Sequence, residues 1–121
     1  MKESFLKRAK ENIESSELLF ENGKYNASAN RAYYAAFQMA IVAIYNTGTE
    51  PNIDHKTVRA LFSDYYFNKR KILPSKYNDY LRELQHIRSD ADYKHGVSKK
   101  IAKQQLKMAQ ELVKQILEVI E

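Results

Sequence analysis

The chain has 121 residues, of which 44% are hydrophobic and 29% charged, as is typical of one globular domain covering residues 1–121. Three Gly and two Pro are too few for the many turns of an all-β fold, and the lack of Cys excludes disulfides and thiolate metal sites. The net charge of +5 favours polyanionic partners only mildly. Charged residues such as Lys2 and Lys7 stand where a secretory signal would be apolar, so we expect a cytoplasmic location.

Two helices are predicted in the first part of the chain. Between residues 4 and 22, apolar side chains recur every three or four positions, and Gly23 then supplies a stop signal. A second helix is expected from about 25 to 46, and its stretch 32–45 is apolar around the whole circumference except at Gln38. This pattern predicts a buried central helix, and the apolar stretch is too short to cross a membrane.

Three further helices are expected after the break that follows residue 46. Asp54 is placed to cap a helix that ends near residue 68, and Pro74 precedes a fourth helix that Gly96 closes. Ser98 is placed to cap the last helix. Its apolar seam consists of Ala102, Leu106, Ala109, Val113, Ile116 and Ile120. The pattern predicts an all-α fold, an antiparallel up-and-down bundle of four to five helices.

Arg31 opens the apolar central helix and is followed by Tyr33, Tyr34 and Phe37. A guanidinium group is costly to bury alone, so we expect a carboxylate partner for it. Two interpretations remain open. Arg31 is either a structural ion-pair residue beside an aromatic core, or a ligand-binding residue beside a stacking Tyr34.

The densest polar cluster spans residues 88–95. In a continuous helix Arg88, Asp92 and His95 share one face, and the first two are spaced for an ion pair. One interpretation is an exposed ion pair with a histidine that suits the helix C-terminus. The other is an anion-binding corner, because Lys99 and Lys100 follow at the start of the next helix, where the helix dipole disfavours cations.

The pair Glu83 and His86 has the spacing of metal ligands in some helical bundles. Such sites need a second pair and further glutamates, which the sequence does not offer. We therefore expect no metal and no other cofactor.

Three segments together resemble the small stand-alone HEPN domain proteins of bacteria and archaea. They are the run Arg31-Ala32-Tyr33-Tyr34-Ala35-Ala36-Phe37, then His55 with Val58, Phe62 and Tyr66, then Arg88-x-x-Ala91-Asp92-Tyr93. The resemblance covers nearly the whole chain. It implies a homodimeric bundle of four to five helices, often encoded beside a minimal nucleotidyltransferase in toxin–antitoxin pairs. Many members are metal-independent endoribonucleases, so the resemblance also implies this activity.

The resemblance also implies a site. In the nuclease members an Arg and a His, separated by four to six residues, contribute from both subunits to a cleft at the dimer interface. Here these residues correspond to Arg88 and His95, which are the expected catalytic pair. The expected substrate- or anion-binding residues are Arg31, Tyr34, Asp92, Tyr93, Lys99 and Lys100.

The sequence is compatible with three functions. In an RNase, His95 would exchange protons with a ribose 2′-hydroxyl and the leaving oxygen, while Arg88 stabilises charge on the phosphate. A non-catalytic HEPN module would instead bind RNA or a nucleotide, or dock on a nucleotidyltransferase antitoxin. A purely structural dimerisation bundle is the third possibility, and no membrane partner is expected.

Overall fold

A computed structural model describes residues 1–93 and 96–120, with the backbone alone at residues 90–93. The described part is all-α and contains no strand, which confirms the predicted fold class. Its elements are α1 (Lys2–Glu21), α2 (Tyr25–Tyr45), α3 (His55–Ser63), the π-helical turn η1 (Asp64–Asn68), the 3-10 helix η2 (Ser75–Asp79), α4 (Tyr80–Tyr93) and α5 (Lys99–Ile120).

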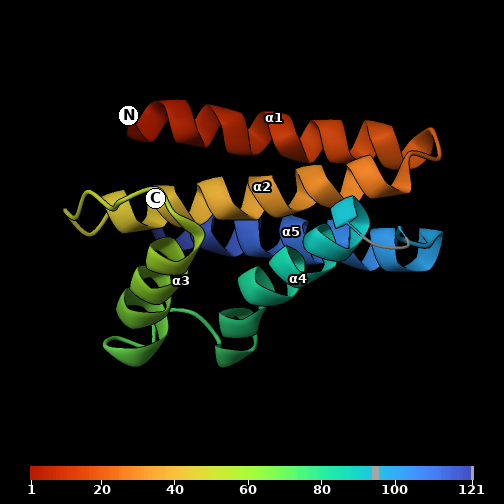
Figure 1. Ribbon diagram of the computed structural model, residues 1–121. Coiled ribbons are helices and arrows are strands. Elements are labelled where there is room, and N and C mark those ends of the chain that lie inside the picture. The colour runs from red at the N-terminus through yellow and green to blue at the C-terminus, as the bar shows by residue number, and fades with distance from the viewer. Residues whose placement is uncertain (94–95, 121) are drawn as a thin grey trace.

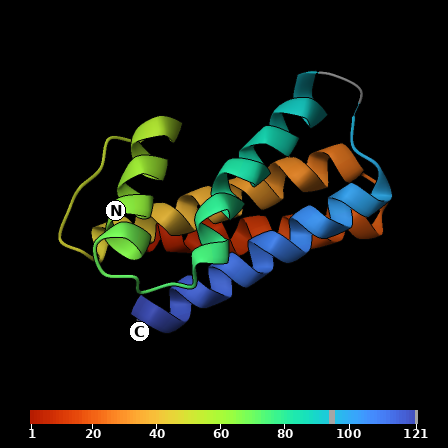
Figure 2. The same ribbon diagram turned by 90° about the horizontal axis from the view of Figure 1, so that it is seen from below.

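Helix α2 lies at the centre of the bundle and packs against each of the other four α-helices. Helices α1 and α2 form an antiparallel pair, and α5 runs beside α2 in the same direction as α2 (Figure 1). Helices α3 and α4 lie on the side of α2 that is opposite α1, and both cross α2 steeply (Figures 1 and 2). One side of α2 is thus covered by a pair of helices that approach it from different directions.

The apolar stretch of α2 forms most of the core, as predicted. Every residue from Met39 to Ile44 is fully buried, as are Ala32, Tyr33 and Ala36. Small side chains let α1 approach closely, and there Ser16 and Ser28 each donate a side-chain hydrogen bond of 2.8 Å to the other's carbonyl oxygen. These reciprocal bonds satisfy two hydroxyl groups that are wholly buried.

The start of α3 is fixed by its cap and its end by contacts with α2. The side chain of Asp54 accepts a 2.8 Å hydrogen bond from the backbone N–H of Thr57, as the sequence predicts for an N-cap. The chain then widens into the π-helical turn η1, where the buried Tyr66 donates a 2.6 Å hydrogen bond to the carbonyl oxygen of Ala43. This bond anchors the end of α3 to the end of α2.

The start of α5 is capped by Ser98, whose hydroxyl accepts a 3.2 Å hydrogen bond from the backbone N–H of Ile101. Its predicted seam is buried from Ala102 through Ile116, and Leu112 joins it. Among the helices that the structure describes, none combines the length and the apolar character that crossing a bilayer requires.

Candidate functional site

Arg88 lies on α4 and is held by aromatic side chains of α2. Its Nη2 donates a 3.0 Å hydrogen bond to the hydroxyl of Tyr34. Its Cζ lies 5.2 Å from the centroid of the Tyr34 ring and 5.8 Å from that of Tyr33, within the range of cation–π attraction. A half-buried guanidinium group is therefore oriented by two tyrosines that stand more than fifty positions earlier in the chain.

A second guanidinium group, that of Arg31, lies against the same tyrosine. Its Cζ is 5.0 Å from the Tyr34 centroid. The expectation of a carboxylate partner is wrong: Arg31 donates to the amide oxygens of Asn12, at 3.1 Å, and of Asn30, at 2.6 Å and 3.1 Å. Amide oxygens satisfy the donors without neutralising the charge, so Arg31 keeps its full attraction for an anion.

His55 joins the group from the first turn of α3. Its Nδ1 is hydrogen-bonded to the hydroxyl of Tyr33, and its ring lies 4.7 Å from that of Phe37, centroid to centroid. Burial lowers the pKa of His55, and the positive charges of Arg88 and Arg59 lower it further. Near neutral pH the imidazole is therefore uncharged, and its Nδ1 can accept a hydrogen bond.

Tyr33 is the fully buried member of the group. Burial raises the pKa of its hydroxyl, and the neighbouring Tyr34 adds to this rise, while Arg88 and Arg59 oppose it. The Tyr33 hydroxyl therefore stays protonated and acts as a hydrogen-bond donor toward the His55 ring. We name these five side chains, Arg31, Tyr33, Tyr34, His55 and Arg88, the Arg88 cluster.

The chemistry of the Arg88 cluster suits an anion that carries a planar group. Two guanidinium groups supply charge and directed donors for phosphate oxygens. The Tyr34 ring offers a partly exposed aromatic surface on which a base can stack. In the part of the chain whose side chains are described, no three His, Asp or Glu side chains gather as metal ligands would.

The structure brings some of the predicted residues together and leaves others elsewhere. Arg31, Tyr34 and Arg88 meet in one cluster. His95 lies outside the described residues, and so do the side chains of Asp92 and Tyr93. The predicted roles of these three residues stay predictions.

Lys99 and Lys100 are exposed on the first turn of α5. The turn before them is tied to α2, because the N–H of Val97 donates a 2.6 Å hydrogen bond to the side-chain oxygen of Asn26. No contact of the described residues links these lysines to the Arg88 cluster. The anion-binding corner therefore stays a prediction and is separate from the cluster in the described contacts.

His55 is the member to which the sequence alone assigned no role. Asp54 identified the helix start, and therefore placed His55 in the first turn of α3. One feature of the sequence could have pointed to His55: it is a titratable residue at the start of a short helix, α3, whose other face is apolar. What the sequence lacked was the packing of α3 on α2, which alone brings His55 to Tyr33.

Comparisons with known proteins found a matching family model and similar archaeal proteins. The family model of the HEPN domain matches residues 2–121. The UPF0332 protein PH1297 of Pyrococcus horikoshii is 34% identical over 88 residues, which are 73% of this chain and 58% of that protein. A Methanocaldococcus jannaschii protein named "Putative toxin MJ0605" is 30% identical over 91 residues, 75% of this chain and 66% of that one. The match thus spans less than two thirds of either relative's length.

Proposed function

We propose, on the premise that this chain belongs to the HEPN domain family, that it is a metal-independent endoribonuclease with a toxin-like role. The observation that carries the proposal is the half-buried guanidinium group of Arg88, held by Tyr34 and flanked by Arg31. A pre-oriented cation of this kind stabilises the charge that grows on a phosphate during transesterification. The name of the Methanocaldococcus relative supports the toxin-like part.

The proposed reaction is an attack of a ribose 2′-oxygen on the adjacent phosphorus. The bond between that oxygen and phosphorus forms while the bond from phosphorus to the 5′-oxygen breaks, which leaves a 2′,3′-cyclic phosphate and a 5′-hydroxyl end. A base removes the 2′-proton, and an acid protonates the leaving 5′-oxygen. The family resemblance assigns proton transfer to His95, and Arg88 would bind the non-bridging phosphate oxygens.

A homodimer is part of the proposal, because the family resemblance places the Arg and His of both subunits in one cleft. The proposed second partner is a nucleotidyltransferase that acts as the antitoxin. Both partners would bind on the exposed side of the Arg88 cluster.

A non-catalytic module that binds a nucleotide is the second candidate. The observation that favours it is the placement of two guanidinium groups about 5 Å from one tyrosine ring. Such an arrangement binds the phosphates and stacks the base of a nucleotide without any proton-transfer group. In this case the chain would bind RNA or a nucleotide with the same residues but would not cut.

The decisive experiment is cleavage of a panel of single-stranded RNAs in excess EDTA. The proposal expects cyclic phosphate ends, no cleavage of 2′-deoxy substrates, and a loss of about 10²-fold or more in Arg88→Ala and in His95→Ala. Tyr34→Phe keeps the ring but removes the hydroxyl that accepts from Arg88, a charged hydrogen bond worth about 1.5 kcal/mol, so its rate should fall about tenfold.

The matched control is Lys107→Ala, which removes one exposed positive charge from α5, a helix that contributes no residue to the Arg88 cluster. Its rate should equal that of the wild type. Equal activity in the wild type and in Arg88→Ala would point to a contaminating nuclease. RNA binding without cleavage by the wild type would favour the second candidate.

A further inference from the structure

Two adjoining hollows lie between α3 and α4. The first, of about 290 Å³, is lined by α3, by η2 and by the start of α4, and the second, of about 260 Å³, continues along α4. Arg59 of α3 and Arg82 of α4 line both, so the hollows form one depression. Helices α3 and α4 lie on the same side of α2, as Figure 2 shows from below. We name this depression the α3–α4 groove.

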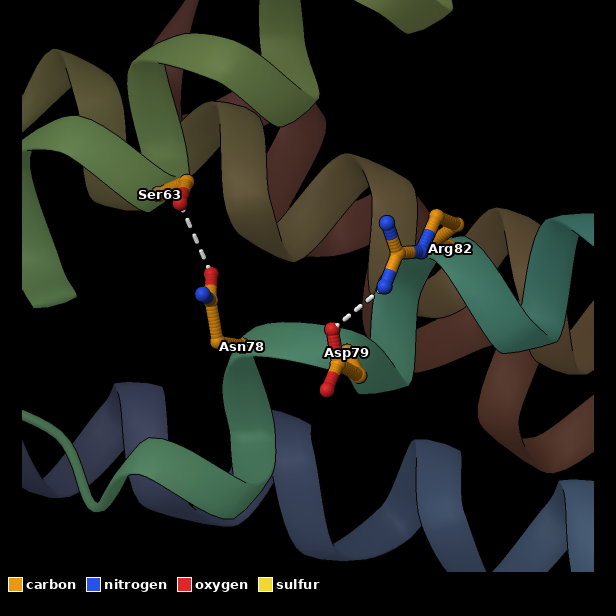
Figure 3. A network of polar contacts seen from close by, with 4 residues as sticks. All are labelled: Ser63, Asn78, Asp79 and Arg82. Carbon is orange, nitrogen blue, oxygen red and sulfur yellow. Dashed lines mark hydrogen bonds and ion pairs between the residues drawn. The ribbon is translucent and has the colours of Figure 1, made fainter.

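The walls of the α3–α4 groove are fixed at one end. There Ser63, the last residue of α3, donates a 2.8 Å hydrogen bond to the side-chain oxygen of Asn78 in η2 (Figure 3). Below the walls lies α2, which contacts both helices. A groove whose walls are tied in this way is formed before a ligand arrives, which lowers the ordering cost of binding.

The groove carries an excess of positive charge. Among its described lining residues, Lys56, Arg59 and Arg82 are cationic, and Asp79 is the single carboxylate. Asp79 accepts a 2.7 Å hydrogen bond from Arg82 (Figure 3), but both side chains are more than two-thirds exposed. Exposed ion pairs of this kind are worth about 0–1 kcal/mol, so a phosphate can compete for Arg82.

The groove lies next to the Arg88 cluster. Arg59 donates from Nε to the carbonyl oxygen of His55, at 3.4 Å, and its charge is close enough to lower the pKa of that imidazole. On the opposite wall, Ser89 lines the second hollow and is the sequence neighbour of Arg88 in α4. None of the five cluster side chains is among the residues that line the two hollows, so the groove borders the Arg88 cluster through Arg59 and Ser89.

An unsatisfied polar atom marks the second hollow. Gln85 lines it, and its side-chain oxygen is buried without a hydrogen-bond partner among the described residues. Terminal amide torsions are soft, so a modest rotation would turn this amide toward a donor or acceptor in the groove. A buried polar group without a partner is uncommon in proteins and is satisfied when a polar ligand binds beside it.

We propose that the α3–α4 groove binds the sugar–phosphate backbone of single-stranded RNA and guides it to Arg88. Arg59 and Arg82 bind successive phosphates from opposite walls, and Asp79 limits the affinity by holding Arg82. The RNA nature of the ligand rests on the proposed function, whereas the place of binding rests on the groove itself.

The test measures binding alone, with a fluorescent 12-nucleotide single strand whose 2′-O-methyl riboses cannot be cleaved. The double variant Arg59→Gln/Arg82→Gln should bind at least tenfold more weakly. Each phosphate contact with a single strand contributes about 0.7 to the slope of log K against log salt, so the slope should fall by about 1.4. The matched control, Lys107→Gln/Lys114→Gln, removes two exposed charges from α5 and should change neither quantity more than about twofold.

A substitution in the opposite direction tests whether Asp79 holds Arg82 back from the ligand. Asp79→Asn releases Arg82 and should tighten binding about two- to threefold, while its exposed position leaves folding unaffected. Arg82→Gln alone, also at an exposed position, should weaken binding and reduce the slope by about 0.7. These two single variants carry the test if the double variant fails to fold.

Several results would overturn the proposal. One is equal weakening in the two double variants, and another is unchanged binding in Asp79→Asn. A third is competition by polyglutamate as strong as that by unlabelled oligonucleotide of equal charge, because the groove would then be a general anion surface or a protein-docking site. Binding through Arg59 and Arg82 without any RNA cleavage would refute the proposed nuclease but not the groove.

Discussion

Because Tyr33 and His55 share a hydrogen bond, the effect of Tyr33→Phe on stability should depend on whether His55 is present. We expect Tyr33→Phe to destabilise the wild type and to stabilise a variant that lacks His55. In the wild type, Tyr33→Phe removes the hydroxyl and should lower the free energy of unfolding by about 1 kcal/mol, the net value of one ordinary hydrogen bond. The half-buried imidazole that remains can be hydrated, so the cost stays small. His55→Leu is different, because it leaves the hydroxyl of a fully buried tyrosine without its acceptor.

An orphaned buried donor costs about 1–3 kcal/mol. Leucine fills a volume similar to that of the imidazole, so it keeps water away from the hydroxyl. In the His55→Leu background, Tyr33→Phe should therefore raise the free energy of unfolding by about 1–2 kcal/mol. The same substitution thus destabilises one protein and stabilises the other, and the coupling energy is about 2–3 kcal/mol.

Urea unfolding of the four proteins, followed by circular dichroism at pH 7.5, measures this cycle. Each denaturation slope should agree with that of the wild type, so that the midpoints report stability. If Tyr33→Phe has the same sign in both backgrounds and its two values agree within about 0.5 kcal/mol, the two side chains are independent and our account of the Arg88 cluster is wrong.

Three further predictions concern pH, backbone and assembly. Because the pKa of His55 is lowered in the folded state by burial and by Arg88 and Arg59, the unfolded chain takes up a proton below about pH 6.5 that the folded chain lacks. Stability should thus fall from pH 7.5 to 5.5, and less so in His55→Leu. Gly96→Ala should cost more than Gly23→Ala in urea unfolding: both have positive φ, worth about 1–2 kcal/mol, but only at Gly96 would the new Cβ approach a side chain, at 3.1 Å. Light scattering at tens of micromolar protein should show a dimer, and a mass near 14.2 kDa would contradict it.

Most of the fold could be predicted because its signals are local. Gly23, Asp54 and Ser98 mark helix ends through backbone conformation and capping, which depend only on neighbouring residues. The π-helical turn η1 and the 3-10 helix η2 were not predicted, and each lies where a tertiary contact decides the backbone. In η1 that contact is the bond from Tyr66 to the end of α2.

The candidate site was less predictable because it depends on how the helices pack. Arg88 and Tyr34 could each be predicted as site residues from the sequence. Their contact, however, depends on the crossing of α4 over α2, which no local sequence pattern determines. The same holds for His55 and Tyr33. The wrong partner expected for Arg31 has another cause: charge pairing was assumed, whereas the amide oxygens of Asn12 and Asn30 satisfy the donors equally well.

Neighbouring tyrosines of α2 position both walls of the groove, and they do so with different burial. Consecutive helical residues point about 100° apart, so Tyr33 reaches His55 of α3 while Tyr34 reaches Arg88 of α4. Tyr33 is fully buried, and its substitution should therefore change stability above all. Tyr34 is partly exposed and accepts from the guanidinium group that meets the ligand, so its substitution should change ligand binding and catalysis as well as stability. Comparing Tyr33→Phe with Tyr34→Phe in both assays therefore separates the part of the Arg88 cluster that holds α3 in place from the part that meets the ligand.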